Sequence, residues 1–183
     1  TVEYAGVFRR FGNGMDRANL SPVSNEYTVK ENHMDLAFFG VAGALAFAAV
    51  GSALGAGTAG MAAVGAWKKC FMQNKPAPFL LIAFVGAPLT QTIYGLILMN
   101  AIRDAANAAA AAGGDAGLGM LLLGAGVLGG IAMGFSAWFQ GKAGAVSADA
   151  LAESGKGFGN YIIVLGLVET VALFVMVFLL TLL

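Results

Sequence analysis

The segment "GFGNYIIVLGLVETVALFVMVFLLTLL", residues 157–183, decides the fold class of this chain. It contains one charged residue, Glu169, with 12 residues before it and 14 after it. A helix needs about 20 apolar residues to cross a bilayer, so this segment is long enough to span one with a carboxylate near its middle. Insertion of a charged residue at a helix centre costs about 2.5–3.5 kcal/mol, and such residues usually mark an ion or proton path.

The composition of the whole chain also indicates a membrane protein. Of its 183 residues, 58% are hydrophobic and only 11% are charged, whereas soluble domains contain about 25% charged residues. The formal net charge is zero, so nothing favours a nucleic-acid or acidic partner. The single cysteine, Cys70, excludes a disulfide framework within the chain.

Four segments are free of charge or nearly so: 36–67, 76–102, 116–141 and 157–183. Each is long enough for a transmembrane helix, and none shows the short alternating pattern of barrel strands. The sequence therefore predicts an all-α membrane protein with four transmembrane helices in two tandem hairpins, residues 34–107 and 108–183. Residues 1–33 are more polar; of a native extension, an expression remnant and an interfacial segment, we favour a native, ordered extension of unknown role.

Basic residues indicate the orientation of the helices in the membrane. Five lysines lie in the predicted loops 68–75 and 142–156, whereas the middle loop, 103–115, has one arginine and two aspartates. By the positive-inside rule, the two lysine-bearing loops are cytoplasmic and both termini are outside. We therefore expect a multi-pass protein of the cell membrane.

The two hairpins share an internal repeat. "SALGAGTAGMA" (52–62) and "SAWFQGKAGAV" (136–146) align without gaps and match at serine and at two glycines. Small residues at this spacing predict close approach of helix backbones in lipid. The stretch "GAGTAG" (55–60) also fits a dinucleotide-binding fingerprint, but its place inside a long apolar helix argues against that function.

Several polar residues accompany the carboxylate in these apolar segments. Thr90, Gln91 and Tyr94 fall within one helical turn, and Gln140 falls near the end of the third segment. Each alone is explained by bonding between helices, which is worth roughly 0.6 kcal/mol. Together with Glu169 they supply a carboxylate, amide carbonyls and a hydroxyl, the oxygen ligands that a hard cation prefers. Their combination favours an ion-binding site.

In four motifs, residues 34–183 resemble the proteolipid of V-type and A-type rotary ATPases, the c or K component, and most of all its sodium-pumping bacterial members. The motifs are "GSALGAGTAGMA", "PLTQTIYG", "FQGKAGA" and "LVETVALF". The resemblance implies a sodium site with Glu169 as the ion-carrying carboxylate. It also implies four further ligands: Gln140, Gln91, the Thr90 hydroxyl and the backbone carbonyl of Ala87. Tyr94 would hold the carboxylate through a hydrogen bond.

The resemblance also implies the assembly. Identical copies would form a closed, lipid-embedded rotor ring that turns against a static membrane protein of the a or I type. A central-stalk protein would bind the cytoplasmic loops, and ATP would be hydrolysed in a separate soluble head, so the chain itself would not be an enzyme.

Three alternatives remain open at the level of sequence. Proton carriage needs only the carboxylate and gives no reason for the two glutamines and the threonine, so we favour Na⁺ over H⁺. A small four-helix transporter or channel and a structural membrane oligomer are the other two. The absence of a second charged residue within the four segments counts against the transporter.

Overall fold

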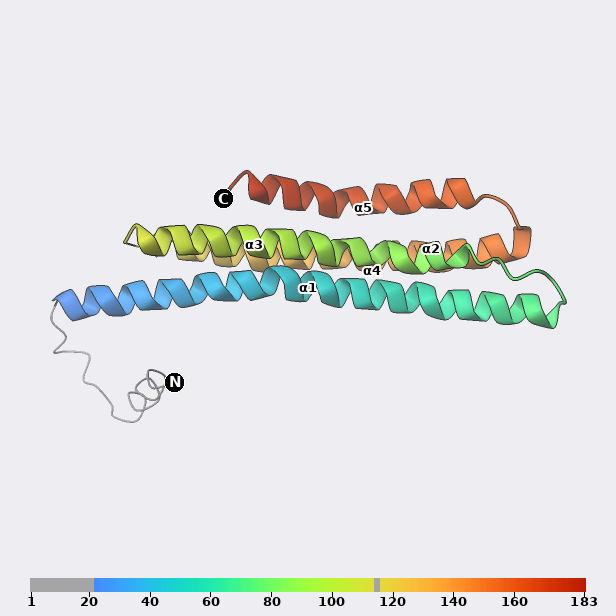
Figure 1. Ribbon diagram of the computed structural model, residues 1–183, viewed down its shortest axis with the longest axis horizontal. Helices are drawn as coiled ribbons and strands as arrows, with labels where there is room; N and C mark the ends of the chain where they lie inside the picture. The colour runs from blue at the N-terminus through green and yellow to red at the C-terminus, as the bar shows by residue number, and fades with distance from the viewer. Residues whose placement is uncertain (1–21, 114–115) are drawn as a thin grey trace, which may run out of the picture.

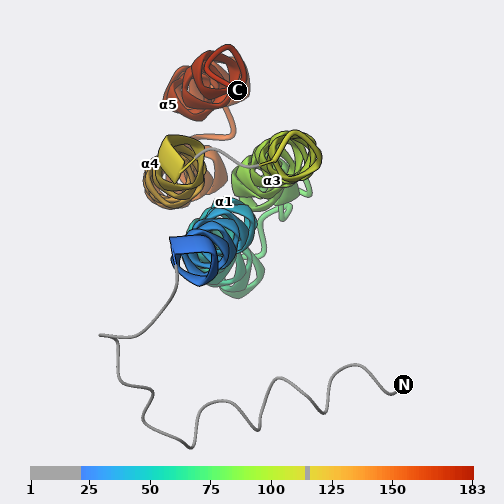
Figure 2. The ribbon, with the colours of Figure 1, turned by 90° about the vertical axis from the view of Figure 1, so that its left-hand side faces the viewer.

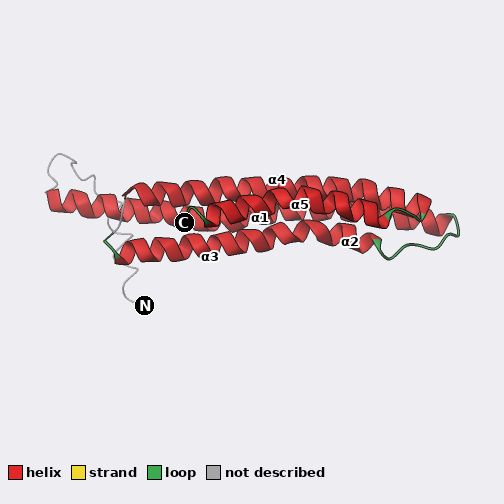
Figure 3. Cartoon of the chain, turned by 90° about the horizontal axis from the view of Figure 1, so that it is seen from above, coloured by secondary structure: helices red, strands yellow, loops and turns green. Residues whose placement is uncertain are grey.

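The computed structural model describes residues 22–113 and 116–183, and all regular secondary structure in these residues is helical. The elements are α1 (Pro22–Met72), α2 (Leu81–Gly86), the 3₁₀ turn η3 (Ala87–Leu89), α3 (Thr90–Ala111), α4 (Ala116–Ser154) and α5 (Phe158–Leu180). Figures 1 and 3 show these helices lying side by side along one common axis. Of the extension expected over residues 1–33, residues 1–21 lie outside the described residues, and residues 22–33 belong to α1.

Four helical stretches of the described chain are long and apolar enough to cross a membrane: Leu36–Met72, Leu81–Ala111, Gly117–Ser154 and Phe158–Leu180. A lipid environment offers no water to backbone N–H and C=O groups, so a helix, which bonds them internally, suits such segments. The predicted all-helical fold with four long apolar helices packed as hairpins is therefore confirmed. The chain is a multi-pass membrane protein.

The predicted ends of the helices were wrong, because charge marks the end of an apolar span and not the end of a helix. The predicted loop 103–115 is helical as far as Ala111, and the predicted loop 142–156 is helical as far as Ser154. Residues 68–72 of the predicted loop 68–75 also belong to α1. The first two of these stretches are rich in alanine, the best helix former. The domain limits expected at 33/34 and 107/108 consequently lie inside α1 and α3.

The turn between α4 and α5 requires glycine. Gly155 and Gly157 have φ angles of 65° and 88°, in the left-handed region that side chains with a Cβ rarely adopt. Two such residues within three positions reverse the chain sharply. The second hairpin therefore closes immediately beyond the end of α4.

The helices form a compact group in which α1 and α4 make the closest pair. Seen end-on in Figure 2, α4 and α3 lie between α1 and α5, and α5 packs against both α4 and α3. A Cβ added to Gly51 would overlap the carbonyl oxygen of Gly134, and one added to Gly141 would overlap the backbone of Gly55. The close backbone approach that the small residues predict is thus found between α1 and α4.

Replacing Gly51 by alanine should destabilise the chain, because the new methyl group has no room against the α4 backbone. Overpacking of this kind costs roughly 1–3 kcal/mol, and we expect a lower midpoint in thermal unfolding followed by circular dichroism in detergent. Gly166→Ala in α5 is the matched control, since a Cβ there meets open space. Equal midpoints for the two variants would contradict this packing.

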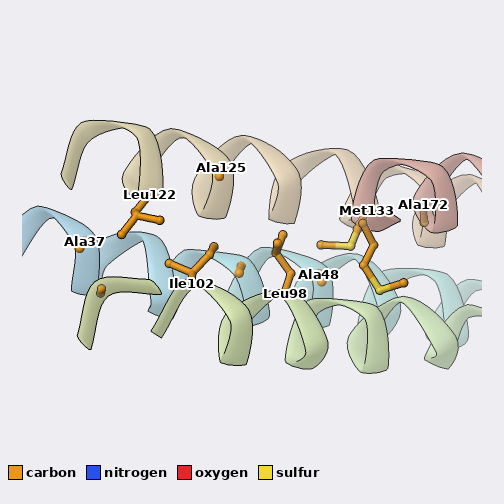
Figure 4. Packing of buried hydrophobic residues seen from close by; sticks show 11 residues of the cluster. Ala37, Ala48, Leu98, Ile102, Leu122, Ala125, Met133 and Ala172 are labelled. Carbon is orange, nitrogen blue, oxygen red and sulfur yellow. The ribbon is translucent and has the colours of Figure 1, made fainter. Parts of the chain in front are cut away.

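Buried apolar residues form two clusters that lie at different heights along the helices. The first, which Figure 4 shows, contains Ala37, Ala44, Ala48, Leu98, Ile102, Ala106, Leu122, Ala125, Met133, Ala172 and Met176. The second contains Ala63, Ala66, Leu81, Phe84, Ala148, Leu151 and Leu165. On α4 and on α5, residues 134–147 and 166–171 separate the two clusters. The polar residues that the sequence singled out lie in this interval.

Candidate ion-binding site

The carboxylate of Glu169 receives hydrogen bonds on both oxygens. The Tyr94 hydroxyl donates to Oε1 at 2.8 Å, and Nε2 of Gln140 donates to Oε2 at 3.2 Å. The three residues come from α3, α4 and α5, and Glu169 itself is half-buried. The ion pairs found in the described part of the chain, Lys69–Glu153 and Arg103–Asp104, involve other carboxylates. Glu169 is therefore held by neutral donors from two neighbouring helices.

Two fully buried glutamines extend this arrangement across the chain. Gln91 and Gln140 both have an exposed fraction of 0%, and Nε2 of Gln91 donates to Oε1 of Gln140 at 2.8 Å. Gln140 also donates to the carbonyl oxygen of Leu165 at 3.1 Å. Because buried amides are costly unless they are hydrogen-bonded, these bonds fix Gln140 between α3 and α5.

A group of oxygens lies next to Gln91 where η3 meets α3. The Thr90 hydroxyl is 3.0 Å from the carbonyl oxygen of Ala87 and 3.2 Å from Oε1 of Gln91. It can donate its one hydrogen to only one of them at a time. The Thr90 hydroxyl oxygen therefore lies close to two other oxygens that could bind the same hard cation.

Pro88 explains the local backbone at this point. Proline lacks an amide hydrogen and its ring disturbs the preceding helical turn, and here the helix tightens into the 3₁₀ turn η3. The backbone N–H of Thr90 bonds to the carbonyl of Ala87 in the i to i+3 pattern of that turn. In a regular α-helix this carbonyl would accept only the backbone N–H of the residue four positions later. In the 3₁₀ turn it accepts the N–H of Thr90, and it therefore lies beside the Thr90 hydroxyl.

The residues that the sequence predicted for the site thus lie in one connected set of hydrogen bonds. Hydrogen bonds run from Gln91 through Gln140 to Glu169, and Tyr94 donates to the other carboxylate oxygen. The Thr90 hydroxyl joins this set by donating either to Gln91 or to the Ala87 carbonyl. Among the described residues, no three His, Cys, Asp or Glu side chains gather as a metal cluster. The donor set is instead one carboxylate with amide, hydroxyl and backbone oxygens, which suits a hard monovalent or divalent cation.

Two contributions to the site were missed by sequence reasoning. Ser136, 6% exposed, donates from its hydroxyl to the carbonyl of Val168 at 2.9 Å and so ties α4 to α5 next to Glu169. The Leu165 carbonyl, one turn earlier, accepts from Gln140. The signal for Ser136 was present, since it is one of the matched positions of the internal repeat. No signal identified the Leu165 carbonyl, because any residue supplies one.

The two hairpins place different residues at the equivalent point of their second helices. "LTQT" (89–92) aligns with "LVET" (167–170) at leucine and threonine, which pairs Gln91 with Glu169. On the first helices, the repeat pairs Gln140 with Ala56. The first hairpin therefore has a neutral amide in place of the carboxylate, and the structure brings that amide to the glutamine of the second hairpin.

These observations describe a multi-pass membrane protein whose apolar helices enclose a carboxylate and a set of uncharged oxygen donors. Residues 123–182, most of α4 and α5, match the family model for the ATP synthase C subunit. Over these residues, the second hairpin is similar to the ATP synthase C subunit. A search of curated proteins found no match to the chain. Both Gln140 and Glu169 lie inside the matched segment, whereas Thr90, Gln91 and Tyr94 lie outside it.

Proposed function

We propose that this protein is a rotor-ring proteolipid of a V/A-type rotary ATPase and that it carries Na⁺ across the membrane at Glu169. The observation that carries the proposal is the hydrogen-bonded set around the half-buried Glu169, within an apolar helical group that includes a segment similar to the ATP synthase C subunit. The proposed ligands are Glu169, Gln140, Gln91, the Thr90 hydroxyl and the Ala87 carbonyl.

The oxygens beside Glu169 support a cation over a bound proton. Both carboxylate oxygens accept a hydrogen bond, one from Tyr94 and one from Gln140. Both donors are uncharged, so they do not neutralise a carboxylate, and a charge inside a membrane is costly unless it is paired. A sodium ion among the oxygens of Gln91, Thr90 and Ala87 would supply the opposite charge, and these oxygens would have no use in proton carriage.

The proposed mechanism follows from this neutralisation. With the cation bound, the site carries no net charge and can face lipid at low cost as the ring turns. At the static membrane protein, an aqueous path to one side allows the ion to leave, and a basic side chain of that protein replaces it. Hydrolysis of ATP in a separate soluble head drives the rotation, so the chain binds and moves the ion but catalyses no reaction itself.

The ends of the helices are the proposed contact with the rest of the motor. We assign the lysine-bearing ends of α1 and α4 to the cytoplasm on the positive-inside rule. Lys69 of α1 forms an ion pair with Glu153 of α4, and both side chains are partly exposed. The two helices are thus joined where a central-stalk protein would bind.

The sodium assignment is tested by labelling with a carboxyl-reactive carbodiimide. A bound cation shields the carboxylate, so added Na⁺ should slow the labelling of Glu169 at neutral pH, as measured by mass spectrometry of the purified protein. Potassium at the same ionic strength controls for screening, and Glu153, an exposed carboxylate of the same chain, controls for reagent activity. Equal labelling of Glu169 with and without sodium would overturn the sodium assignment and leave the proton as the carried ion.

A further inference from the structure

The hydroxyl of Ser52 is buried and has no hydrogen-bond partner in the described part of the chain. Its residue is 2% exposed, and among the buried side-chain nitrogen and oxygen atoms described here it is the one left unbonded. A buried hydroxyl without a partner costs free energy. An alanine would fill the same place in α1 without that cost, so the serine calls for an explanation.

The register of α1 against α3 places Ser52 opposite Gln91. The Cβ of Ala48 lies 2.7 Å from where a Cβ on Gly95 would be, and the Cβ of Pro88 lies 2.8 Å from where a Cβ on Gly55 would be. The two helices run antiparallel within a hairpin. Ser52 follows Ala48 by four residues, and Gln91 precedes Gly95 by four, so the same register pairs them. Both residues are buried.

The internal repeat gives an independent indication of what this serine does. Its counterpart Ser136 lies at the same position in the second hairpin and donates to the carbonyl of Val168, the residue just before Glu169. In both hairpins a serine of the first helix therefore lies beside the polar residue of the second. In the second hairpin the serine is already bonded, whereas in the first, as described here, it is not.

The amide of Gln91 has hydrogen-bonding capacity that fits Ser52. A glutamine amide nitrogen carries two hydrogens, and the contacts found for Nε2 of Gln91 give it one acceptor, Oε1 of Gln140. Its other hydrogen needs an acceptor if the amide is to stay in one orientation. That orientation matters, because an amide that turns end for end offers a cation its NH₂ group in place of its oxygen.

We propose that Ser52 is a positioning residue for the ion site. When the cation is bound, its hydroxyl accepts the second N–H of Gln91 and holds Oε1 of Gln91 toward the ion. The inference rests on the proposed function. Ser52 touches neither the carboxylate nor the ion, so it acts on sodium affinity through Gln91 and leaves the chemistry of Glu169 unchanged.

The variant Ser52→Ala tests this in the complete protein, with sodium protection of Glu169 against carbodiimide as the readout. The sodium concentration that halves the labelling should rise roughly three- to tenfold, the effect of losing one ordinary hydrogen bond. The pH dependence of labelling without sodium should be unchanged. Thermal stability should be equal or higher, because the alanine removes an unbonded hydroxyl. A serine with only a structural role would lower the thermal stability when it is replaced and would leave the half-protecting sodium concentration unchanged.

Ser147→Ala is the matched control, since Ser147 is also a buried serine of a long helix and bonds only to the carbonyl of Ala143 in its own helix. It should leave the half-protecting sodium concentration unchanged. If Ser52→Ala and the unaltered protein share one half-protecting concentration, or if Ser147→Ala shifts it equally, the role of Ser52 is overturned while sodium carriage stands. If sodium fails to protect the unaltered protein, the proposed function fails and this inference fails with it.

Discussion

Replacing Glu169 by glutamine should abolish ion transport while leaving the four-helix fold intact. Glutamine has the same shape, and its carbonyl oxygen can still accept the hydrogen bond that Tyr94 donates. What is lost is the negative charge and the acceptor for Nε2 of Gln140, which keeps its bond to the Leu165 carbonyl. Without the negative charge, the site no longer attracts a cation. Insertion of the helix into the membrane also becomes easier, because a charged residue at the helix centre costs about 2.5–3.5 kcal/mol. The variant should therefore fold at least as readily as the unaltered chain.

The measurement is sodium uptake by the complete ATPase reconstituted in vesicles, with assembly followed by native gel migration of the detergent-solubilised ring. We expect uptake at background level and a ring that migrates like the unaltered one. Asp104→Asn, which removes an exposed carboxylate paired with Arg103, should keep its transport activity. Sodium uptake that persists in the Glu169 variant would overturn the assignment of this residue as the ion carrier.

Gln140→Leu should produce the second largest effect. Gln140 is fully buried, accepts from Gln91 and donates to both Leu165 and Glu169. Leucine fills a similar volume but leaves the Gln91 nitrogen and the Leu165 carbonyl without these partners, each at about 1–3 kcal/mol. It also removes a proposed sodium ligand. The sodium concentration that protects Glu169 should therefore rise by about a hundredfold, or roughly 2.7 kcal/mol.

Carbodiimide labelling itself should continue in this variant, because Glu169 is still present. Gln73→Leu supplies the control, since Gln73 is an exposed glutamine just beyond the end of α1. Protection at an unchanged sodium concentration in Gln140→Leu would remove Gln140 from the ligand set. Loss of labelling would show that the variant has displaced the carboxylate itself.

The number and type of the membrane helices could be predicted from the sequence, because a long run without charge has few structural solutions in lipid. The segment 157–183 is the clearest case, and α5 (Phe158–Leu180) fills it almost completely. The ends of α3 and α4 could not be predicted from charge. Arg103 and Lys142 mark where the apolar spans stop, yet both helices continue beyond them, since alanine-rich polar segments also form helix.

The candidate site was predictable in its members and not in its connections. Glu169, Gln91 and Gln140 are noticeable because polar side chains are rare in such apolar segments. The direct bond between the two glutamines depends on how α3 is placed against α4. That placement depends on the 3₁₀ turn at Pro88 and on the glycine contacts between α1 and α4. One sequence does not predict which residues of two packed helices lie opposite each other.

The first hairpin has Gln91 at the position where the second has Glu169, and this difference affects the energetics of the proposed motor. A ring built from such chains has one carrier for every four helices, where a ring of single hairpins with a carboxylate in each would have one for every two. At equal circumference it moves half as many ions in each revolution. The energy released by a revolution of the soluble head is then shared among fewer ions, so each can be driven against a steeper gradient. Because Gln91 is neutral, such a ring would move few ions in each revolution, which suits pumping better than synthesis.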